Sequence, residues 1–194
     1  MKKKLILVTS PPASGKTYIS KMLAANLDHV VYLDKDTLVP LSNVVFNVAG
    51  EEVNRSSDFF EEYIRDVEYE VTLNFAFEAI QYEDIVLINA PFTREIRNTE
   101  YMVSLRKKLR EYGASLTVVW VQTDVEVCKQ RMIERNSPRD TWKIANWDEY
   151  ISGINFNIPE NLNDPSVVDQ LLIFENSSQE EYEESMAKML KEIQ

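Results

Sequence analysis

The segment Leu5-Ile-Leu-Val-Thr-Ser-Pro-Pro-Ala-Ser-Gly-Lys-Thr17 decides the fold of this 194-residue chain. It begins with a short apolar run that predicts a buried strand, and a helical pattern starts at Lys16. Between them, Ser10 to Thr17 matches the phosphate-binding consensus G-x-x-x-x-G-K-[ST], except that serine replaces the first glycine. A strand, this loop and a helix in that order predict a site for nucleotide phosphates.

The residue types in this loop suit phosphate chemistry. Backbone amides at a helix N-terminus attract anions, and Gly15 permits close backbone approach. Lys16 can reach the β- and γ-phosphates, and the Thr17 hydroxyl can ligate Mg²⁺. We therefore expect ATP and Mg²⁺ as cofactors. The expected nucleotide-binding residues are Ala13, Ser14, Gly15, Lys16, Thr17 and Tyr18.

Outward from this loop, apolar strands alternate with helices. Strands are expected at 5–9, 29–33, 84–89, 116–121 and 171–174, and helices at 16–27, 58–82, 94–112, 125–135, 141–154 and 179–193. Pro40 predicts a break, and residues 41–57 carry little pattern. The alternation predicts one α/β domain, 1–194, with the three-layer P-loop NTPase fold: a five-stranded, mainly parallel sheet with helices on both faces and a small lid.

The expected helix at 58–82 carries an apolar stripe. Six residues recur there at helical spacing: Phe60, Tyr63, Ile64, Val67, Val71 and Phe75. We expect its aromatic residues, Phe60, Tyr63 and Phe75, in the core, with the alternative that a few of them line an acceptor pocket.

The amino-acid composition indicates which classes of binding partner and which cellular compartment are favoured. With 21 Lys+Arg against 32 Asp+Glu, the formal net charge is −11, which repels a phosphodiester backbone and makes nucleic acid a disfavoured partner. A single cysteine, Cys128, excludes an intrachain disulfide and fits a reducing compartment. Apolar runs are too short to cross a bilayer, so we expect a cytoplasmic protein without a membrane partner.

The end of the third strand narrows the class of P-loop protein. The Asn-Lys-x-Asp sequence with which GTPases read guanine is missing, and the strand ends at Asn89 where ATPase motors usually carry a carboxylate. An asparagine can bond to a Mg²⁺-bound water but is a poor general base. This favours a kinase, in which the acceptor hydroxyl is the nucleophile.

A kinase needs a carboxylate near that hydroxyl. Asp34-Lys35-Asp36 directly follows the second strand, beside the phosphate-binding loop in a doubly wound sheet. Asp36 is the candidate base, and Asp34 is a candidate Mg²⁺ ligand or substrate contact. The alternative is that both aspartates cap a turn or a helix.

A kinase also needs cations that stabilise the negative charge developing on the transferred phosphoryl group. Arg131, Arg135 and Arg139 recur every four residues after the fourth strand, and Pro138 ends the helix before the last of them. We interpret them as catalytic arginines of a lid that closes over the nucleotide. The alternative is a solvated basic face that pairs with nearby glutamates.

These residues give the chain a resemblance to P-loop kinases related to adenylate kinase, in the branch of zeta toxins, chloramphenicol phosphotransferase and polynucleotide 5′-kinases. The loop 11–17 looks like that branch's P-loop. The segment 32–38 is similar to the one that carries its general-base aspartate, which falls on Asp36. The stretch 128–140 looks like its lid arginines. The resemblance also extends to uncharacterised ATP-binding proteins grouped with these kinases.

The resemblance implies positions for both substrates. The segment 172–178 resembles the strand and loop beside adenine in nucleoside monophosphate kinases, which implies an adenine contact at Asn176. The architecture implies a lid at about 135–150 and an acceptor-binding region at about 38–80. Candidate groups for the acceptor are Asp34, Arg65, Arg94 and Arg97.

The expected activity is phosphoryl transfer from ATP to the hydroxyl of a small molecule. Two alternatives stay open: an ATP-binding switch or scaffold without transferase activity, and a nucleic-acid end kinase. The acceptor and the oligomeric state stay open as well.

Overall fold

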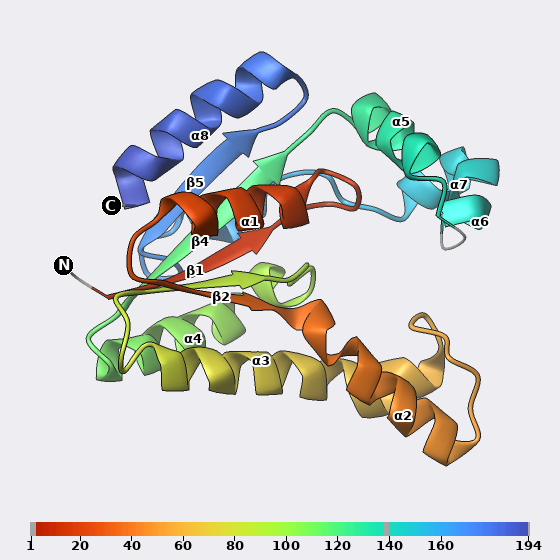
Figure 1. The fold of residues 1–194 in the computed structure, drawn as a ribbon, viewed down its shortest axis with the longest axis horizontal. Helices are drawn as coiled ribbons and strands as arrows, with labels where there is room; N and C mark the ends of the chain where they lie inside the picture. Colours follow the sequence, from red (N-terminus) through yellow and green to blue (C-terminus); the bar gives the residue numbers. More distant parts are fainter. Residues whose placement is uncertain (1–2, 138–139, 194) are drawn as a thin grey trace.

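The computed structural model describes residues 3–137 and 140–193 and has one five-stranded sheet (Figure 1). Its strands are β1 (Lys4–Thr9), β2 (Val30–Asp34), β3 (Ile85–Asn89), β4 (Ser115–Gln122) and β5 (Gln170–Glu175). They lie in the order β2-β3-β1-β4-β5, and every neighbouring pair is parallel. The expected five-stranded parallel sheet is confirmed. All five strands therefore end at the edge that carries the phosphate-binding loop.

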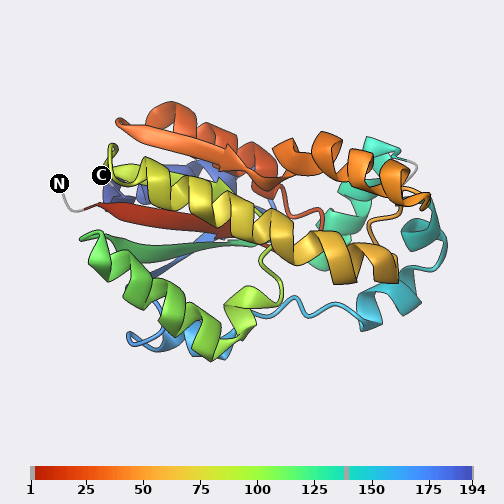
Figure 2. The same cartoon turned by 90° about the horizontal axis from the view of Figure 1, so that it is seen from below.

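Helices cover both faces of the sheet. The α-helices are α1 (Lys16–Asn26), α2 (Val39–Ala49), α3 (Arg65–Ala79), α4 (Thr99–Glu111), α5 (Val125–Arg135), α6 (Thr141–Ala145), α7 (Trp147–Ser152) and α8 (Gln179–Ile193). Short 3₁₀ turns η1 (Lys35–Leu38), η3 (Glu95–Arg97) and η5 (Glu160–Asn163) and a π-helical turn η2 (Phe60–Ile64) link them. Figure 2 shows α3 and α4 over one face, and Figure 1 shows α1 and α8 over the other.

The central strand β1 divides the core into two layers. Leu5 and Leu7 pack with the side chains of α3 and α4, whereas Ile6 and Val8 pack with those of α1 and α8. All four are fully buried. A strand covered on both faces needs apolar residues at every position, which explains its continuous apolar run.

The expectation of a break at Pro40 was wrong. The structure has α2 there, and Pro40 stands in its first turn. Proline suits that position because a first-turn amide has no partner within the helix. Gly50 ends α2 in the left-handed conformation, with φ of 74°.

The expected helix at 94–112 is also divided. It begins as η3, and α4 starts afresh at Thr99 because the Asn98 side chain accepts a hydrogen bond from the Tyr101 amide.

Only two of the six residues of the apolar stripe in the expected helix at 58–82 are buried. Phe60 and Ile64 are buried with Phe46 of α2, but Val67 and Phe75 are exposed. The face of α3 that covers the sheet carries Tyr69, Leu73, Ala76 and Phe77 instead.

The region in which a lid was expected, about 135–150, contains the short helices α6 and α7 beside α5 (Figure 1). Within residues 3–137 and 140–193, no helix combines the length and the apolar character required to span a membrane.

Candidate functional site

A cavity of about 440 Å³ lies over the loop between β1 and α1. It is lined by residues 10–18, Asp36, Pro91, Thr93, Arg131, Arg135 and Lys143. The cavity thus combines the phosphate-binding loop with one carboxylate and cations from the lid region. Its position at the carboxyl ends of the strands is where open α/β sheets bind ligands.

The loop has two residues in the left-handed conformation, Ala13 with φ of 62° and Gly15 with φ of 90°. A β-carbon at Gly15 would lie 2.6 Å from Nδ2 of Asn176, so glycine is required by contact as well as by conformation. Ser10 is not among the described residues with positive φ. Serine therefore replaces the consensus glycine there without backbone strain.

The N-terminus of α1 is free to receive an anion. No side chain caps it, and its first turn carries no acidic residue. The Ser14 carbonyl accepts hydrogen bonds from Thr123 Oγ1 (3.1 Å), Arg131 Nη1 (3.2 Å) and Asn176 Nδ2 (2.7 Å). Because the peptide is trans, the Gly15 N–H points away from these donors. The loop therefore fits a bound phosphate chain.

Lys16 extends from the first turn of α1 to the end of β3. Its ammonium donates to Asn89 Oδ1 at 2.6 Å. Desolvation lowers the pKa of Lys16 to about 8, while the carboxylates of Asp36 and Asp34 oppose part of that shift. The Lys16 ammonium is therefore charged at neutral pH, and its hydrogen bond to Asn89 fixes it beside the loop.

Asn89 contacts both residues that are expected to bind Mg²⁺, Asp34 and Thr17. Its amide nitrogen lies 2.9 Å from Asp34 Oδ2 and 3.3 Å from Thr17 Oγ1. A hydroxyl and a carboxylate are the hard oxygen donors that Mg²⁺ prefers. The described part of the chain contains no group of three or more His, Cys, Asp or Glu residues able to hold a metal. The donor set fits a cation that takes its other ligands from phosphate and water.

The two aspartates Asp34, at the end of β2, and Asp36, in η1, make different contacts. Asp34 caps η1 by accepting from the Asp36 amide at 3.0 Å, and it also accepts from Tyr32 Oη at 3.0 Å. Asp34 thus caps η1 through Oδ1, as the alternative expected, while its Oδ2 faces Asn89. The Asp36 carboxylate is 68% exposed, lines the cavity and lies 3.3 Å from the Lys35 ammonium.

The cations that line the cavity from α5 and α6 are anchored by backbone carbonyls and one buried carboxylate. Arg131 donates to the carbonyls of Ser14 and Asn176. Arg135 donates through Nε and Nη2 to Asp140 Oδ2, at 2.9 and 2.6 Å, and Lys143 lies 3.4 Å from Oδ1 of Asp140.

Asp140 is fully buried, so it fixes both cations at the cavity wall. The third predicted arginine, Arg139, lies outside the described residues. The sequence missed Lys143 and its anchor Asp140, which the i, i+3 spacing could have signalled.

A second cavity of about 410 Å³ adjoins the loop at Gly15. It is lined by Gly15, Tyr18, Arg131, Asn176, Ser177, Ser178, Gln179 and Tyr182. The rings of Tyr18 and Tyr182 are 5.7 Å apart at one wall. Asn176 thus lies where an adenine contact was expected, and that contact stays a prediction. Tyr182 was missed because it lies far along the sequence from the loop.

The three predicted acceptor arginines lie outside the first cavity. Arg65 and Arg94 line a separate cavity of about 530 Å³ that α3 and α4 share. Arg65 lies 2.8 Å from Glu95 and 2.7 Å from Asp66, and Arg94 pairs with Glu61. These carboxylates neutralise both cations, a pairing that the sequence did not show.

Arg97 is closer to the loop. It donates to the carbonyls of Asn155 (3.2 Å) and Asn157 (2.8 Å) and lies over the ring of Trp120. It lines a cavity of about 360 Å³ that shares Pro91, Thr93 and the first half of the loop with the first cavity.

The chain is similar to proteins of known family and fold. The family model of the AAA domain matches residues 5–155. No curated protein matches the chain.

Similar solved structures include the PezAT toxin–antitoxin system of Streptococcus pneumoniae, with a TM-score of 0.62 and 13% identity over 100% of this chain and 88% of that one. Shikimate kinase from Bacteroides thetaiotaomicron has a TM-score of 0.54 and 16% identity over 98% of both chains. The Mycobacterium tuberculosis APS kinase CysC, in complex with AMPPNP and APS, has a TM-score of 0.54 and 18% identity over 98% of both chains. At these identities the likeness shows the fold, which is the P-loop NTPase α/β fold.

Proposed function

The chain belongs to the AAA domain family, and on that premise we propose that it transfers the γ-phosphoryl group of ATP to a hydroxyl of a small molecule. One observation carries this proposal: Lys16 and Asp36 line the same cavity, together with Arg131, Arg135 and Lys143. A kinase needs a base for the acceptor and cations for the transferred phosphoryl group, and this cavity offers both. The zeta-toxin branch stays a prediction.

Asp36 is the proposed general base. Its exposed carboxylate lines the cavity and can accept the proton of an acceptor hydroxyl. Asn89 stands where a hydrolase would need a carboxylate for water. An amide there supports transfer to a bound acceptor over hydrolysis.

Most of the residues that would bind ATP and Mg²⁺ belong to the loop between β1 and α1. The amides of residues 13–18 and Lys16 would hold the phosphates, and Asn176 with its neighbours would hold the adenosine end. Thr17 and Asp34 would ligate Mg²⁺ or its water, with Asn89 orienting both. When bound, Mg²⁺ neutralises charge on the phosphates. Arg131, Arg135 and Lys143 supply positive charge from the lid side.

The test is ADP release from MgATP with a panel of hydroxylated metabolites and antibiotics. We expect one chemical class of acceptor to stimulate release. Asp36→Asn should lower kcat by about 10²–10⁴-fold with little change in ATP affinity, because it removes only the base. Asp58→Asn is the matched control, because Asp58 is exposed and does not line this cavity.

Two outcomes would overturn the proposal. The first is tight MgATP binding with no turnover on any acceptor, which would identify a switch or scaffold. The second is full activity in Asp36→Asn. Salt-sensitive turnover on oligonucleotide ends, without turnover on small molecules, would assign the chain to the end kinases.

A further inference from the structure

Helix α2 presents an apolar face to solvent. Leu41, Val44, Val45 and Val48 are 66%, 53%, 41% and 84% exposed. They fall at positions i, i+3, i+4 and i+7, which is one face of a helix. The opposite side of α2 buries Phe46 against η2. The helix is therefore apolar on two sides, and the chain covers only one of them.

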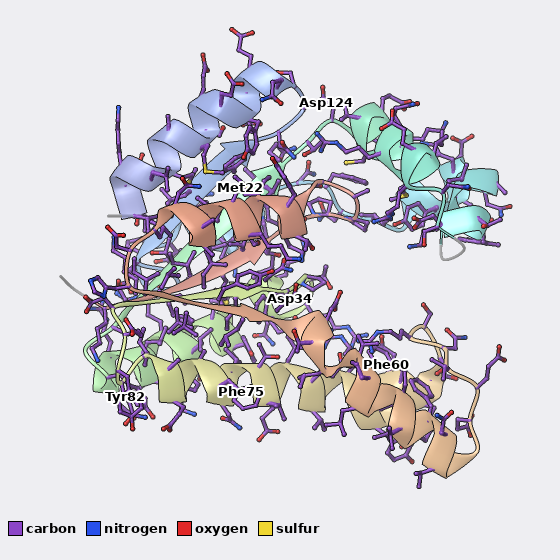
Figure 3. The ribbon with its side chains drawn as sticks, viewed as in Figure 1. Met22, Asp34, Phe60, Phe75, Tyr82 and Asp124 are labelled. Carbon is purple, nitrogen blue, oxygen red and sulfur yellow. The ribbon has the colours of Figure 1, made fainter. Side chains whose placement is uncertain are left out.

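The apolar surface continues along α3. Tyr63, Val67 and Phe75 are 57%, 55% and 55% exposed, and they belong to the stripe of which only Phe60 and Ile64 are in the core. Figure 3 marks Phe60 beside α2 and Phe75 farther along α3. Within the described residues, Val67 and Phe75 belong to no hydrophobic core cluster.

A cavity of about 100 Å³ lies where the two helices meet. We call it, with the exposed apolar residues around it, the docking groove. The cavity is lined by Leu38, Leu41, Ser42, Val45, Tyr63, Ile64, Val67, Glu68 and Val71. It has room for one aliphatic side chain. Exposed apolar surface of this kind marks an interaction site, and a groove between two helices suits an amphipathic helix.

The charge around the docking groove selects the partner. Residues 38–79 carry nine carboxylates and two arginines, a net charge of −7 within the total of −11. Both arginines are paired already, Arg55 with Glu68 and Arg65 with Asp66 and Glu95. Glu62 is exposed and precedes Tyr63, which lines the groove. A second copy of the chain or an anionic membrane would meet like charge here, whereas a basic partner would meet opposite charge.

We propose that the docking groove binds a basic amphipathic helix of another protein. Its apolar residues at i, i+3, i+4 and i+7 lie against α2 and the start of α3, and one of them fills the cavity between Val45 and Val67. Its lysines and arginines contact the exposed carboxylates beside the groove, including Glu62. This surface is separate from the phosphate-binding cavity, because the two share no lining residue.

The probe is a fluorescently labelled synthetic helix of leucine and lysine at helical spacing, and the readout is anisotropy on titration with the full chain. A second peptide carries glutamate in place of every lysine. We expect saturable binding of the lysine peptide and none of the glutamate peptide. Val45→Asp and Val67→Asp should each weaken binding about tenfold or more. Each adds negative charge, so nonspecific attraction of the basic peptide would strengthen instead.

Val103→Asp is the matched control, because Val103 is 39% exposed on α4, away from the docking groove. It should bind the lysine peptide as the wild type does. Thermal melting and ATP affinity should be unchanged in all three variants, which separates this proposal from the proposed kinase activity. Equal binding by Val45→Asp, equal binding of both peptides, or wild-type self-association that Val45→Asp abolishes would overturn it.

Discussion

The ammonium of Lys16 lies 2.6 Å from the side-chain oxygen of Asn89, and this contact joins the phosphate-binding loop to the end of β3. The same asparagine faces Asp34 and Thr17 through its nitrogen. One neutral side chain thus orders a cation, a carboxylate and a hydroxyl. A carboxylate at this position would instead repel Asp34.

Nucleotide affinity should depend on the charge of Lys16. Desolvation lowers its pKa to about 8, so the ammonium is present below that pH and is lost as the pH rises through it. We expect ATP affinity, measured by calorimetry, to decline above about pH 8. Lys16→Arg, whose guanidinium stays charged, should show a flat profile over the same range. A flat profile in the wild type would contradict this assignment.

Gly15 should be intolerant of alanine for two separable reasons. Alanine in the left-handed backbone conformation costs roughly 1–2 kcal/mol of stability. This cost applies at Gly15 and equally at Gly113, whose φ is 69°. Only at Gly15 does the new β-carbon meet an atom, Asn176 Nδ2 at 2.6 Å, whereas nothing lies within 4 Å at Gly113.

Gly15→Ala should therefore lose about tenfold or more in ATP affinity, since each charge-assisted hydrogen bond contributes about 1.5–3 kcal/mol. Gly113→Ala should lose stability alone. Comparable ATP affinity in the two variants would argue against a close fit at Gly15.

Glu68 should make the fold acid-sensitive. Burial alone would raise its pKa, but hydrogen bonds from Arg55, Lys35 and Ser42 outweigh burial and lower the pKa to about 2. Its stabilising effect is fully present above the ordinary value of 4.5 and is lost as the pH falls toward 2. The expected contribution is on the order of 3 kcal/mol at neutral pH.

Urea unfolding between pH 2 and pH 6 measures this effect. Glu68→Gln should lower the free energy of unfolding at neutral pH and flatten its dependence on acid. Glu70→Gln, an exposed neighbour on α3, should leave both unchanged within about 0.5 kcal/mol. Parallel curves for wild type and Glu68→Gln would exclude this role.

Asp140 should hold the lid cations. Its buried carboxylate contacts Arg135 and Lys143, whose side chains are themselves partly exposed. Asp140→Asn should therefore cost only about 1–3 kcal/mol of stability, because both cations can turn to water. Asp148→Asn, at an exposed position of α7, should cost less than about 1 kcal/mol. Hydrogen exchange across 140–152 would report the loosened lid, and unchanged exchange would refute the anchor.

The features that depend on neighbouring residues were predictable. The apolar run before Ser10, the loop and the start of α1 lie within one short segment, and their local pattern predicts both the fold and the phosphate-binding site. Strands such as β3 and β4 were predictable for the same reason, because strands buried on both faces are apolar throughout.

The features that depend on distant partners were not predictable. Helical spacing placed Val67 and Phe75 on one face but could not say whether any element covers that face. Arg65 and Arg94 were suitable ligands for an anionic acceptor, but Glu95 and Glu61 neutralise them in the folded chain. A proline such as Pro40 breaks a helix when it stands in the interior but is favoured in the first turn, and the sequence alone did not show which position it has.

The three hydrogen bonds on the Ser14 carbonyl bear on the kinetics of nucleotide binding. Their donors come from Thr123 after β4, Arg131 on α5 and Asn176 after β5, so the peptide that ends at Gly15 cannot rotate without breaking all three. We therefore expect the loop to keep the same conformation when a nucleotide binds. Association should be a single step whose observed rate rises linearly with ATP concentration in stopped-flow experiments. Any slower phase should then report movement of the α5–α7 helices.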